Sequence, residues 1–326
     1  MLILAADVGG TSTRLAYFQA KAGELEALAE GHYPSGAHAS LYEIVQLFRD
    51  EHRMTPERAC FGVAGPVIEG RVKTPNLPWS IEGRELARVA GLPAVQLIND
   101  LAANTYGISA LKEQDLAVLN PGKRDPAGAI AVVSAGTGLG ESLAYWDGTA
   151  HRPLPSEAGH ADFAPRNDLE TRLLGYLRGE FGRVSYERVL SGPGLGNIYR
   201  FLRDTGYLPE TPALAAALKT GDPAALIAQA ALAGSCPLCS KALDTFVSVY
   251  GAECGNAALR FLATGGLYLG GGIAPHIIER LREAPFLEAF SAKGRLGAFL
   301  ASVPVSVILN DRTALLGAAV AALGEK

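Results

Sequence analysis

The sequence predicts an α/β protein of two domains, each opened by a glycine-rich β-hairpin. Residues 3–18 read ILAADVGGTSTRLAYF, and residues 131–146 read AVVSAGTGLGESLAYW. Each segment is an apolar strand, a glycine-rich turn and a second strand that ends in Leu-Ala-Tyr and an aromatic residue. A chain of 326 residues is also too long for one small core. We therefore expect two related halves that face each other.

Strand and helix patterns alternate after each hairpin, which is typical of α/β layers. In the first half we expect helices over residues 40–53 and 81–90 and from about Leu101, with strands over 59–64 and 94–98. The second half is more helical, with helices over 169–181, 196–205 and 241–261 and a strand over 266–269. A strand over 303–309 and an apolar helix over 313–323 complete the chain.

Composition excludes several classes of protein. Hydrophobic residues make up 48% and charged residues 19%, the balance of a soluble globular chain. With 29 Lys and Arg against 33 Asp and Glu, the net charge of −4 offers no basic field for nucleic acid or an anionic membrane. The first ten residues lack the positive region of a signal peptide, and no apolar run reaches ~18 residues. Four cysteines are not a disulfide framework, so we expect a cytoplasmic protein.

The glycine-rich turns are candidate phosphate sites. Asp7-Val8-Gly9-Gly10-Thr11 lies at the first hairpin tip, where glycines let backbone N–H groups approach an anion and Thr11 adds a hydroxyl. Asp7 repels phosphate but can hold Mg²⁺, usually through water, and the metal then bridges to phosphate oxygens. Residues 136–140 (GTGLG) repeat the arrangement without the aspartate, and residues 270–272 are a third glycine cluster. A single such turn would indicate only a tight hairpin, whereas three clusters favour a nucleotide site.

The nucleotide site is neither a P-loop nor a Rossmann site. No G-x-x-x-x-G-K-[ST] motif occurs in the sequence. Both motifs also need a helix N-terminus, whereas these glycine turns lead into strands. We therefore expect hairpin tips from two domains to hold the nucleotide.

Asp100 is the candidate catalytic base. It directly follows the strand 94–98, at the carboxyl end where ligands collect in open α/β sheets. A carboxylate there can orient an alcohol toward a γ-phosphorus and take its proton. The alternative is that Asp100 or Asn99 caps the helix from Leu101, since both residue types are favoured caps. Asn99 could equally donate to and accept from a substrate hydroxyl.

Glu157, His160 and Glu187 are candidate ligands of a polyol. Glu157 and His160 share a face only in a helix, and Pro155 and Gly159 favour a loop in which both side chains converge on one ligand. Carboxylates and an imidazole match vicinal hydroxyls, each a donor and an acceptor. For His160 a structural role is the alternative, and a metal is disfavoured because no second histidine or cysteine cluster lies nearby. Glu187 taken alone would be a solvated helix residue.

In order along the chain, residues 7–11, 136–138 and 270–273 resemble the first phosphate loop, second phosphate loop and adenosine loop of the sugar kinase/hexokinase/actin superfamily. Within it the chain resembles the bacterial ATP-dependent glucokinases, on the segments LINDL at 97–101, EAGH at 157–160 and ERVLSGPG at 187–194. The resemblance covers essentially the whole chain. It implies an actin-like/hexokinase (ribonuclease H-like) ATPase fold with a cleft between domains. Residues 1–110 plus 301–326 would form the small domain and residues 111–300 the large one, closing over the sugar.

The resemblance also implies an activity: ATP and glucose give glucose 6-phosphate and ADP, with Mg²⁺ and with Asp100 as general base. It assigns the sugar to Asn99, Asp100, Glu157, His160 and Glu187. It assigns the nucleotide to Ala6, Asp7, Val8, Gly9, Gly10, Thr11, Gly136, Thr137, Gly138, Gly271 and Gly272, with Asp7 also holding Mg²⁺ through water. Three carboxylates without Lys or Arg suit an uncharged sugar better than a sugar phosphate. The resemblance further implies a homodimer.

Two other functions stay open at the level of sequence. A kinase for another hexose is one, because the choice of epimer depends on loop shape. A non-catalytic, nucleotide-switched module is the other, although a switch does not need Asp100 or the polyol ligands.

The segment Asn76-Leu77-Pro78-Trp79 also resembles a family loop near the sugar. Cys236 and Cys239 lack a second cysteine pair for zinc, so we expect them to serve packing.

Overall fold

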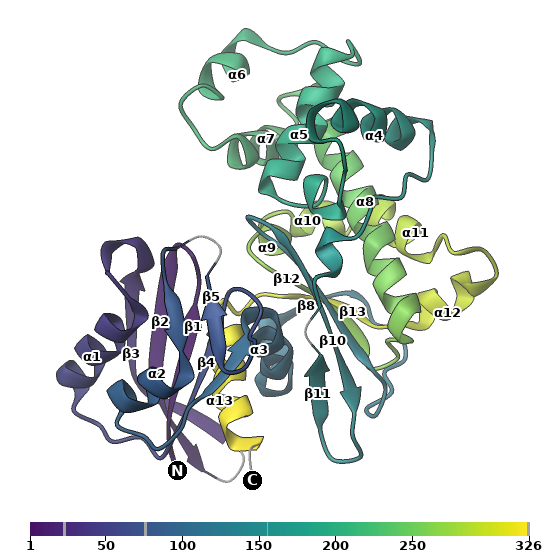
Figure 1. Ribbon diagram of the computed structural model, residues 1–326. Helices are drawn as coiled ribbons and strands as arrows, with labels where there is room; N and C mark the ends of the chain where they lie inside the picture. Colours follow the sequence, from purple (N-terminus) through teal and green to yellow (C-terminus); the bar gives the residue numbers. More distant parts are fainter. Residues whose placement is uncertain (22–23, 75–76, 155, 325–326) are drawn as a thin grey trace. The chain divides into compact units, whose positions relative to one another are not determined.

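The structure is a computed structural model that describes residues 1–326 except 22–23, 75–76, 155 and 325–326 (Figure 1). The chain divides into two units. The first unit is Met1–Leu116, Ser142–Pro155 and Asn310–Lys326, and the second is Ala117–Glu141 and Ser156–Leu309. The domain boundaries expected from the resemblance, at residues 110 and 301, stay a prediction.

The first sheet has the strand order β3-β2-β1-β4-β7. Its strands are β1 (Leu2–Val8), β2 (Ser12–Lys21), β3 (Glu24–Pro34), β4 (Arg58–Val63) and β7 (Gln96–Asn99). β1 and β2 form the expected hairpin, and β3, which the sequence did not predict, extends it. β1, β4 and β7 run parallel, so their carboxyl ends meet at one edge. Asp7 in β1 and Asp100 after β7 therefore lie at the same edge of the sheet.

Side chains alternate along β1 between two cores of the first unit. Leu4, Ala6 and Val8 share a core with α1 (Leu41–His52) and α2 (Gly83–Ala90), whereas Ile3 and Ala5 share one with α13 (Thr313–Gly324). α3 (Asp100–Gly107) packs against α13. Because strand residues two apart share a face, Asp7 lies on the α13 side, together with α3. The last helix, yellow in Figure 1, belongs to the first unit.

The second sheet has the strand order β11-β10-β9-β12-β13-β8. Its strands are β8 (Leu116–Asn120), β9 (Ile130–Ala135), β10 (Leu139–Trp146), β11 (His151–Leu154), β12 (Gly266–Gly270) and β13 (Val305–Ile308). β9 and β10 are the second expected hairpin. β12 runs parallel to both β9 and β13. The strand expected over 303–309, which the resemblance would return to the first half, instead joins this sheet.

A long buried helix, α8 (Pro237–Phe261), organises the helices of the second unit. It packs against α5, α7 and α11. It begins four residues earlier than expected, because the Cys236 Sγ caps it by accepting from the Cys239 N–H at 3.2 Å. Both cysteines are buried, in keeping with a packing role. The other helices of this unit are α4 (Asp168–Phe181), α5 (Gly192–Asp204), α6 (Pro212–Ala217), α7 (Pro223–Leu232), α9 (Ile273–His276), α10 (Ile278–Leu281), α11 (Ala284–Ser291) and α12 (Gly297–Ser302).

Short elements complete the described chain. β5 (Arg71–Lys73) and β6 (Ser80–Glu82) form a two-stranded ribbon. Trp79 beside it is buried in the first unit, whereas Asn76 lies outside the described residues. The 3₁₀ turns outside the site are η1 (Ser35–Ala37), η2 (Ile108–Ala110), η3 (Glu113–Asp115) and η6 (Gly294–Leu296).

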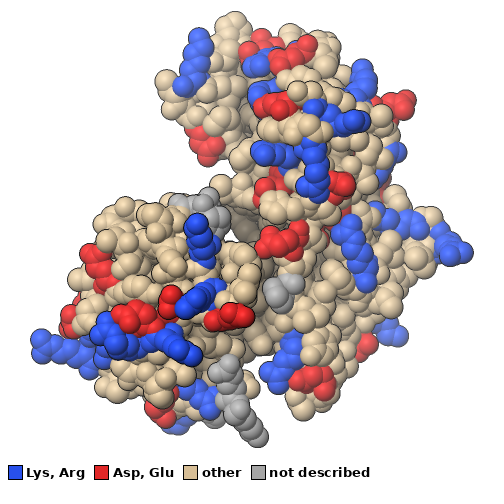
Figure 2. All heavy atoms as spheres, viewed as in Figure 1, with Lys and Arg blue, Asp and Glu red and all other residues tan. Residues whose placement is uncertain are grey.

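The surface charges and the apolarity of the helices agree with the expectations from composition. Figure 2 shows side chains of both signs interspersed over the face in view. No single helix of the described chain has the length and apolarity to cross a membrane; α7 and α8 meet those criteria only jointly, with a bend of 102° between them.

Candidate active site

The first glycine turn is held by hydrogen bonds to its own backbone and to Ser35. The Gly9 N–H donates to the Ser12 carbonyl at 2.9 Å, and the Ser35 Oγ donates to the Gly9 carbonyl at 2.8 Å. The Ser35 N–H donates to the Thr11 carbonyl at 3.0 Å. Thr11 itself is exposed. The turn is therefore fixed in shape before any ligand arrives, which lowers the entropic cost of binding an anion there.

Asp7 lies at the end of β1 in an environment that opposes its ionisation. Burial and, to a smaller extent, the charge of Asp100 raise the pKa of Asp7 to about 6, against the opposing effect of Arg14. Arg14 stands opposite Asp7 in the β1–β2 pair and forms an ion pair with Asp311 at 2.7 Å. Two carboxylates close enough to interact at one sheet edge would gain from a shared cation.

Asn99, not Asp100, caps α3. The Asn99 Oδ1 accepts from the N–H groups of Leu101 at 2.9 Å and Ala102 at 3.3 Å, and its Nδ2 donates to the Gly65 carbonyl at 3.2 Å. Asp100 is the first residue of the helix, and its Oδ1 accepts from the Leu101 N–H at 2.9 Å. The interpretation of Asp100 as the cap is therefore wrong. Its carboxylate is oriented at the helix start rather than consumed in capping.

The donor set near Asp7 fits Mg²⁺. Among the described residues, no three or more His, Cys, Asp or Glu side chains gather as a metal cage. Mg²⁺ commonly uses one or two carboxylates and completes its shell with waters and substrate phosphates. A carboxylate whose pKa is raised by burial and by a neighbouring acid would be stabilised in its charged form by a cation. Asp7 therefore suits a metal that arrives with a phosphate ligand.

Glu157 and His160 flank a single helical turn in the second unit. Glu157 immediately precedes the 3₁₀ turn η4 (Ala158–His160), and the His160 N–H donates to the Glu157 carbonyl at 3.0 Å. Where the sequence predicted a loop, the structure has this short 3₁₀ turn. Residues i and i+3 eclipse in a 3₁₀ turn, so the two side chains leave the backbone on the same side. Both residues are exposed, and Pro155 lies outside the described residues.

Glu187 links the second glycine turn to His160. It belongs to the 3₁₀ turn η5 (Tyr186–Arg188), and its Oε2 accepts from the Leu139 N–H at 3.0 Å. Its Oε1 lies 3.8 Å from the His160 Nδ1. A Cβ added to Gly138 would lie only 2.5 Å from the Glu187 Oε2, so a larger residue there would require this carboxylate to shift. Glu187 is thus not the solvated helix residue that its local sequence suggested.

Two neighbouring cavities of the second unit adjoin the glycine clusters. The larger, of about 710 Å³, is lined by Gly136, Thr137 and the first turn of α5, and the smaller, of about 310 Å³, by Gly272. They share Asp222, Ala224 and Ile273. Gly138 and Gly271 do not line either cavity. Gly271 instead has φ +76°, and a Cβ there would lie 2.2 Å from the Ala135 carbonyl, so it holds the third cluster against β9.

Sequence reasoning missed one face of α5. Asn197, Arg200 and Arg203 line the larger cavity, and Arg200 also forms an ion pair with Glu180 at 3.1 Å. The three residues are spaced three apart, so they share one side of the helix. That spacing, directly after the Ser191-Gly192-Pro193-Gly194 segment, was the available signal.

Comparison with known proteins decides the family. Residues 4–325 match the family described as glucokinase. The chain belongs to the glucokinase family. The glucokinase of Nostoc sp. is 44% identical over 337 residues, covering 98% of both chains, and that of Yersinia enterocolitica is 37% identical, covering 97% of this chain and 94% of the relative. The family resemblance inferred from the sequence is confirmed.

Solved glucokinases share the fold. The crystal structure of glucokinase from an Antarctic psychrotroph has a TM-score of 0.88 and 33% identity, covering 99% of both chains. A ROK family glucokinase from Streptomyces griseus, solved with glucose and AMPPNP, has a TM-score of 0.66 and 20% identity over 100% of both chains, which is a likeness of fold. The predicted two-domain, actin-like sugar-kinase fold is confirmed.

Proposed function

We propose that this chain transfers the γ-phosphoryl group of ATP to the 6-hydroxyl of glucose, with Asp100 as the general base. Membership of the glucokinase family makes it an ATP-dependent glucose kinase. The assignment of roles to residues rests on one observation above the others. Asp100 begins α3 at the sheet edge where Asp7 ends β1, close enough to raise the pKa of Asp7.

Asp100 would accept the proton of the sugar hydroxyl as the phosphoryl group moves. Phosphoryl transfer needs positioning, neutralisation of charge and one proton acceptor, with little covalent chemistry from the protein. The hydrogen bond from the Leu101 N–H to the Asp100 Oδ1 fixes the orientation of the carboxylate. Because Asn99 provides the cap, α3 does not need Asp100 for capping.

Glu157, His160 and Glu187 would bind the sugar hydroxyls in the second unit. Glu187 is oriented by its hydrogen bond from Leu139, and its Oε1 lies on the His160 side. Charge-assisted hydrogen bonds from hydroxyls to carboxylates are short and directional, which suits a neutral polyol. Asn99 and Asp100 complete the proposed sugar ligands, although the Asn99 amide already makes hydrogen bonds within the protein.

Both glycine turns and the third cluster would bind the nucleotide: residues 6–11, Gly136, Thr137, Gly138, Gly271 and Gly272. The cavities beside Thr137 and Gly272 have room for an adenosine. The N-terminus of α5 lines the larger cavity at Gly192, and its partial positive charge favours phosphate. Mg²⁺, held by Asp7 through water, would neutralise phosphate charge. Assembly as a homodimer and a cytoplasmic location stay predictions.

A coupled assay of ADP release with a panel of hexoses tests the function. We expect release that depends on glucose, with the C2 and C4 epimers clearly slower at equal concentration. An epimer that outperforms glucose would make the chain a kinase for another hexose. ATP hydrolysis that no sugar changes would instead indicate a nucleotide-switched module.

A further inference from the structure

A buried polar network on α8 adjoins the proposed sugar ligands, and none of its residues has a role in the proposed phosphoryl transfer. We call it the α8 network. Glu253, Asn256 and Arg260 lie on α8, Glu141 on β10, Tyr186 on η5 and Lys293 just after α11. All six belong to the second unit.

Two acids and one arginine form the centre of the α8 network. Glu253 is fully buried, and its Oε1 lies 2.6 Å from the Arg260 Nη1. Glu141 is 1% exposed, and its Oε2 lies 3.7 Å from the same nitrogen. Neither carboxylate oxygen of Glu141 has a hydrogen-bond partner among the described residues. The two buried carboxylates thus share one directly paired cation, Arg260, whereas Lys293 reaches Glu253 only through Asn256, so two ionised acids here would repel each other at close range.

A proton held between the two acids relieves this repulsion. Burial of Glu141, followed by the charge of Glu253, raises the pKa of Glu141 to about 8, against a smaller opposing effect of Arg260. Protonated Glu141 can donate to Glu253, so a repulsive pair becomes a hydrogen-bonded one. At neutral pH the pair therefore carries one proton and one charge, which Arg260 balances.

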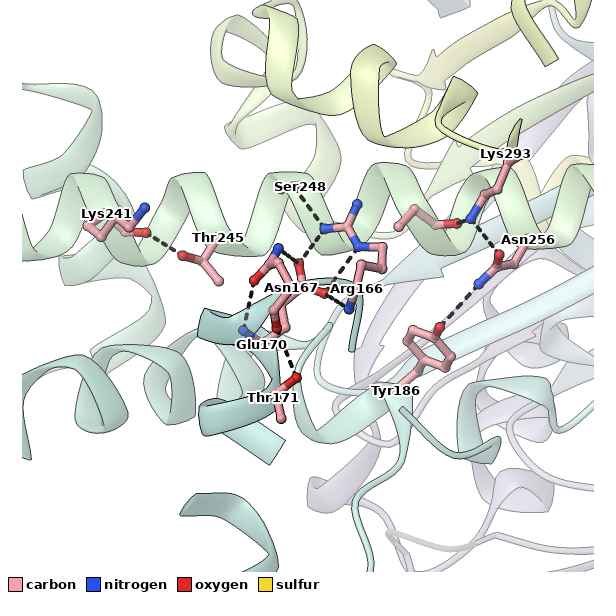
Figure 3. Close-up of polar contacts among 11 residues, drawn as sticks. Arg166, Asn167, Glu170, Thr171, Tyr186, Lys241, Thr245, Ser248, Asn256 and Lys293 are labelled. Atoms are coloured by element: carbon pink, nitrogen blue, oxygen red, sulfur yellow. Dashed lines mark hydrogen bonds and ion pairs between the residues drawn. The ribbon is translucent and has the colours of Figure 1, made fainter. Parts of the chain in front are cut away.

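The α8 network reaches the sugar ligands through Tyr186. The Asn256 Nδ2 donates to the Tyr186 hydroxyl at 3.1 Å (Figure 3). It also donates to the Glu253 Oε2 at 2.8 Å. The Lys293 Nζ donates to the Asn256 Oδ1 at 2.6 Å and so fixes the amide. Tyr186 precedes Glu187 in the chain, and its N–H donates to the carbonyl of Ala161, the neighbour of His160, at 2.9 Å. One buried tyrosine thus anchors the backbone beside both sugar ligands.

The network also reaches Glu187 through β10. Glu141 lies two residues after Leu139, whose N–H holds the Glu187 Oε2. A displacement of Glu141 away from Glu253 would shift the start of β10 and with it this hydrogen bond. Glu187 is consequently supported from two directions, by the η5 backbone and by β10.

We infer that the α8 network positions Glu187 and His160 for sugar binding, and that it does so only while Glu141 and Glu253 share one proton. This inference rests on the proposed role of those two residues as sugar ligands. Tyr186 and Glu141 are positioning residues, since neither is proposed to touch the substrate. Loss of the shared proton places two like charges together in a medium of low dielectric constant, where repulsion is strong. The other titratable or charged groups around Glu141 are Tyr250, Cys254 and Arg260 on α8, Tyr186 on η5, and Lys293 with Arg166 beside it.

The substitution Tyr186→Phe tests the anchor. It removes the hydrogen bond from Asn256 but keeps the ring that packs edge-on against Phe163 at 5.6 Å. We expect the KM for glucose to rise about 3- to 10-fold, the loss that one hydrogen bond produces, with kcat within twofold of wild type. Tyr176→Phe is the matched control, because it removes a phenol–carboxylate hydrogen bond to Asp204 of 2.6 Å outside the α8 network. It should leave the KM unchanged.

The pH dependence tests the shared proton. In the wild type, the KM for glucose should rise as pH increases beyond about 8. Glu141→Gln supplies a permanent N–H donor to Glu253, so its KM should stay near the neutral wild-type value up to pH 9. A KM that rises equally in Glu141→Gln, or an unchanged KM in Tyr186→Phe, would overturn the inference. Should Glu141→Gln not fold, Tyr186→Phe and the wild-type profile still decide it.

The variant Glu187→Gln distinguishes a failure of the sugar-site assignment from a failure of the positioning role of the α8 network. We expect it to raise the KM for glucose by more than Tyr186→Phe does. An unchanged KM in Glu187→Gln would refute the sugar-site assignment itself. A raised KM in Glu187→Gln with wild-type behaviour of Tyr186→Phe would refute only the positioning role of the α8 network.

Discussion

The two glycine hairpins share a backbone plan but differ in the charges they carry. In the first, Asp7 stands opposite Arg14 across β1 and β2. When the hairpins are aligned on their common Leu-Ala-Tyr, Ala135 and Ser142 occupy these two places in the second. There the turn is held by backbone, with the Gly136 N–H donating to the Gly138 carbonyl at 2.9 Å and the Gly192 N–H to the Gly136 carbonyl at 2.8 Å. The repeated hairpin supplies the proposed anion-binding backbone twice, and the proposed metal-binding carboxylate only once.

The paired acids of the two units differ in how their charge is compensated. Asp100 raises the pKa of Asp7, and Glu253 raises that of Glu141. The first pair lies beside a turn whose tip is exposed, where a cation or a substrate proton can compensate the charge. The second pair is buried, and Arg260 and a shared proton compensate it. We therefore expect substitutions in the first pair to affect turnover, and those in the second to affect sugar affinity.

Asp100→Asn should have the largest effect. The amide keeps the size of the side chain and an oxygen for the Leu101 N–H, but it cannot take the hydroxyl proton. We expect kcat to fall by at least about 10²-fold, the lower end of general-base contributions, with glucose still bound. Since Asn99 is the cap, the melting temperature of the same preparation should stay close to that of wild type. Retention of more than about a tenth of wild-type kcat would shift suspicion to Glu157 or Glu187.

Asp7→Asn should raise the Mg²⁺ requirement and lower turnover, by less than Asp100→Asn does, while glucose affinity is kept. Mg²⁺ titrations of the initial rate, with isothermal titration of glucose, measure both. Loss of glucose binding with a normal Mg²⁺ dependence would show that the residue is misassigned.

Asp7→Asn should also change how the stability of the protein depends on pH. Because the pKa of Asp7 rises from its ordinary 3.8 to about 6 on folding, the folded protein holds this proton more tightly than the unfolded chain. The stability contributed by Asp7 therefore falls as pH increases from about 4 to 6 and then levels. In metal-free buffer at pH 7, Asp7→Asn should melt at a higher temperature than wild type. Equal Tm values across this range would contradict the assigned burial.

Of these three variants, Gly138→Ala should have the smallest effect. That effect should be on sugar affinity rather than on turnover. The added Cβ would crowd the Glu187 Oε2 and push the carboxylate off the Leu139 N–H. We expect a several-fold higher KM for glucose, about the loss of one hydrogen bond, and a smaller change in kcat. Gly175→Ala on α4 is a control, since a Cβ there meets nothing within 4 Å. A changed KM for ATP with a normal KM for glucose would place the turn on the nucleotide side alone.

Local patterns in the sequence were sufficient for most of the fold. The two hairpins, α1, α2 and α4 appear within a few residues of their expected bounds. Period and capping set such elements, and both are readable from neighbouring residues. The elements missed were β3, β5, β6, β8 and β11 and the helices α6, α7 and α9 to α12. The exposed outer strand β3 lacks a clean apolar alternation, and α7 is Ala-rich and begins with a proline.

For the site, local sequence was enough to place Asp7, Asp100, the glycine clusters and the Glu157–His160 pair after the strands and turns that carry them. The local sequence offered Asn99 and Asp100 as alternative caps of α3, whereas the hydrogen bond between Glu187 and Leu139 and the pairing of Glu141 with Glu253 appear only in the folded structure. The physical reason is sequence separation. A cap or a hairpin depends on residues two to four apart, whereas the Glu141–Glu253 pair and the Leu139–Glu187 hydrogen bond depend on how β10 packs against α8 and η5. That packing also determines burial, and burial rather than local sequence sets the pKa values of Asp7 and Glu141.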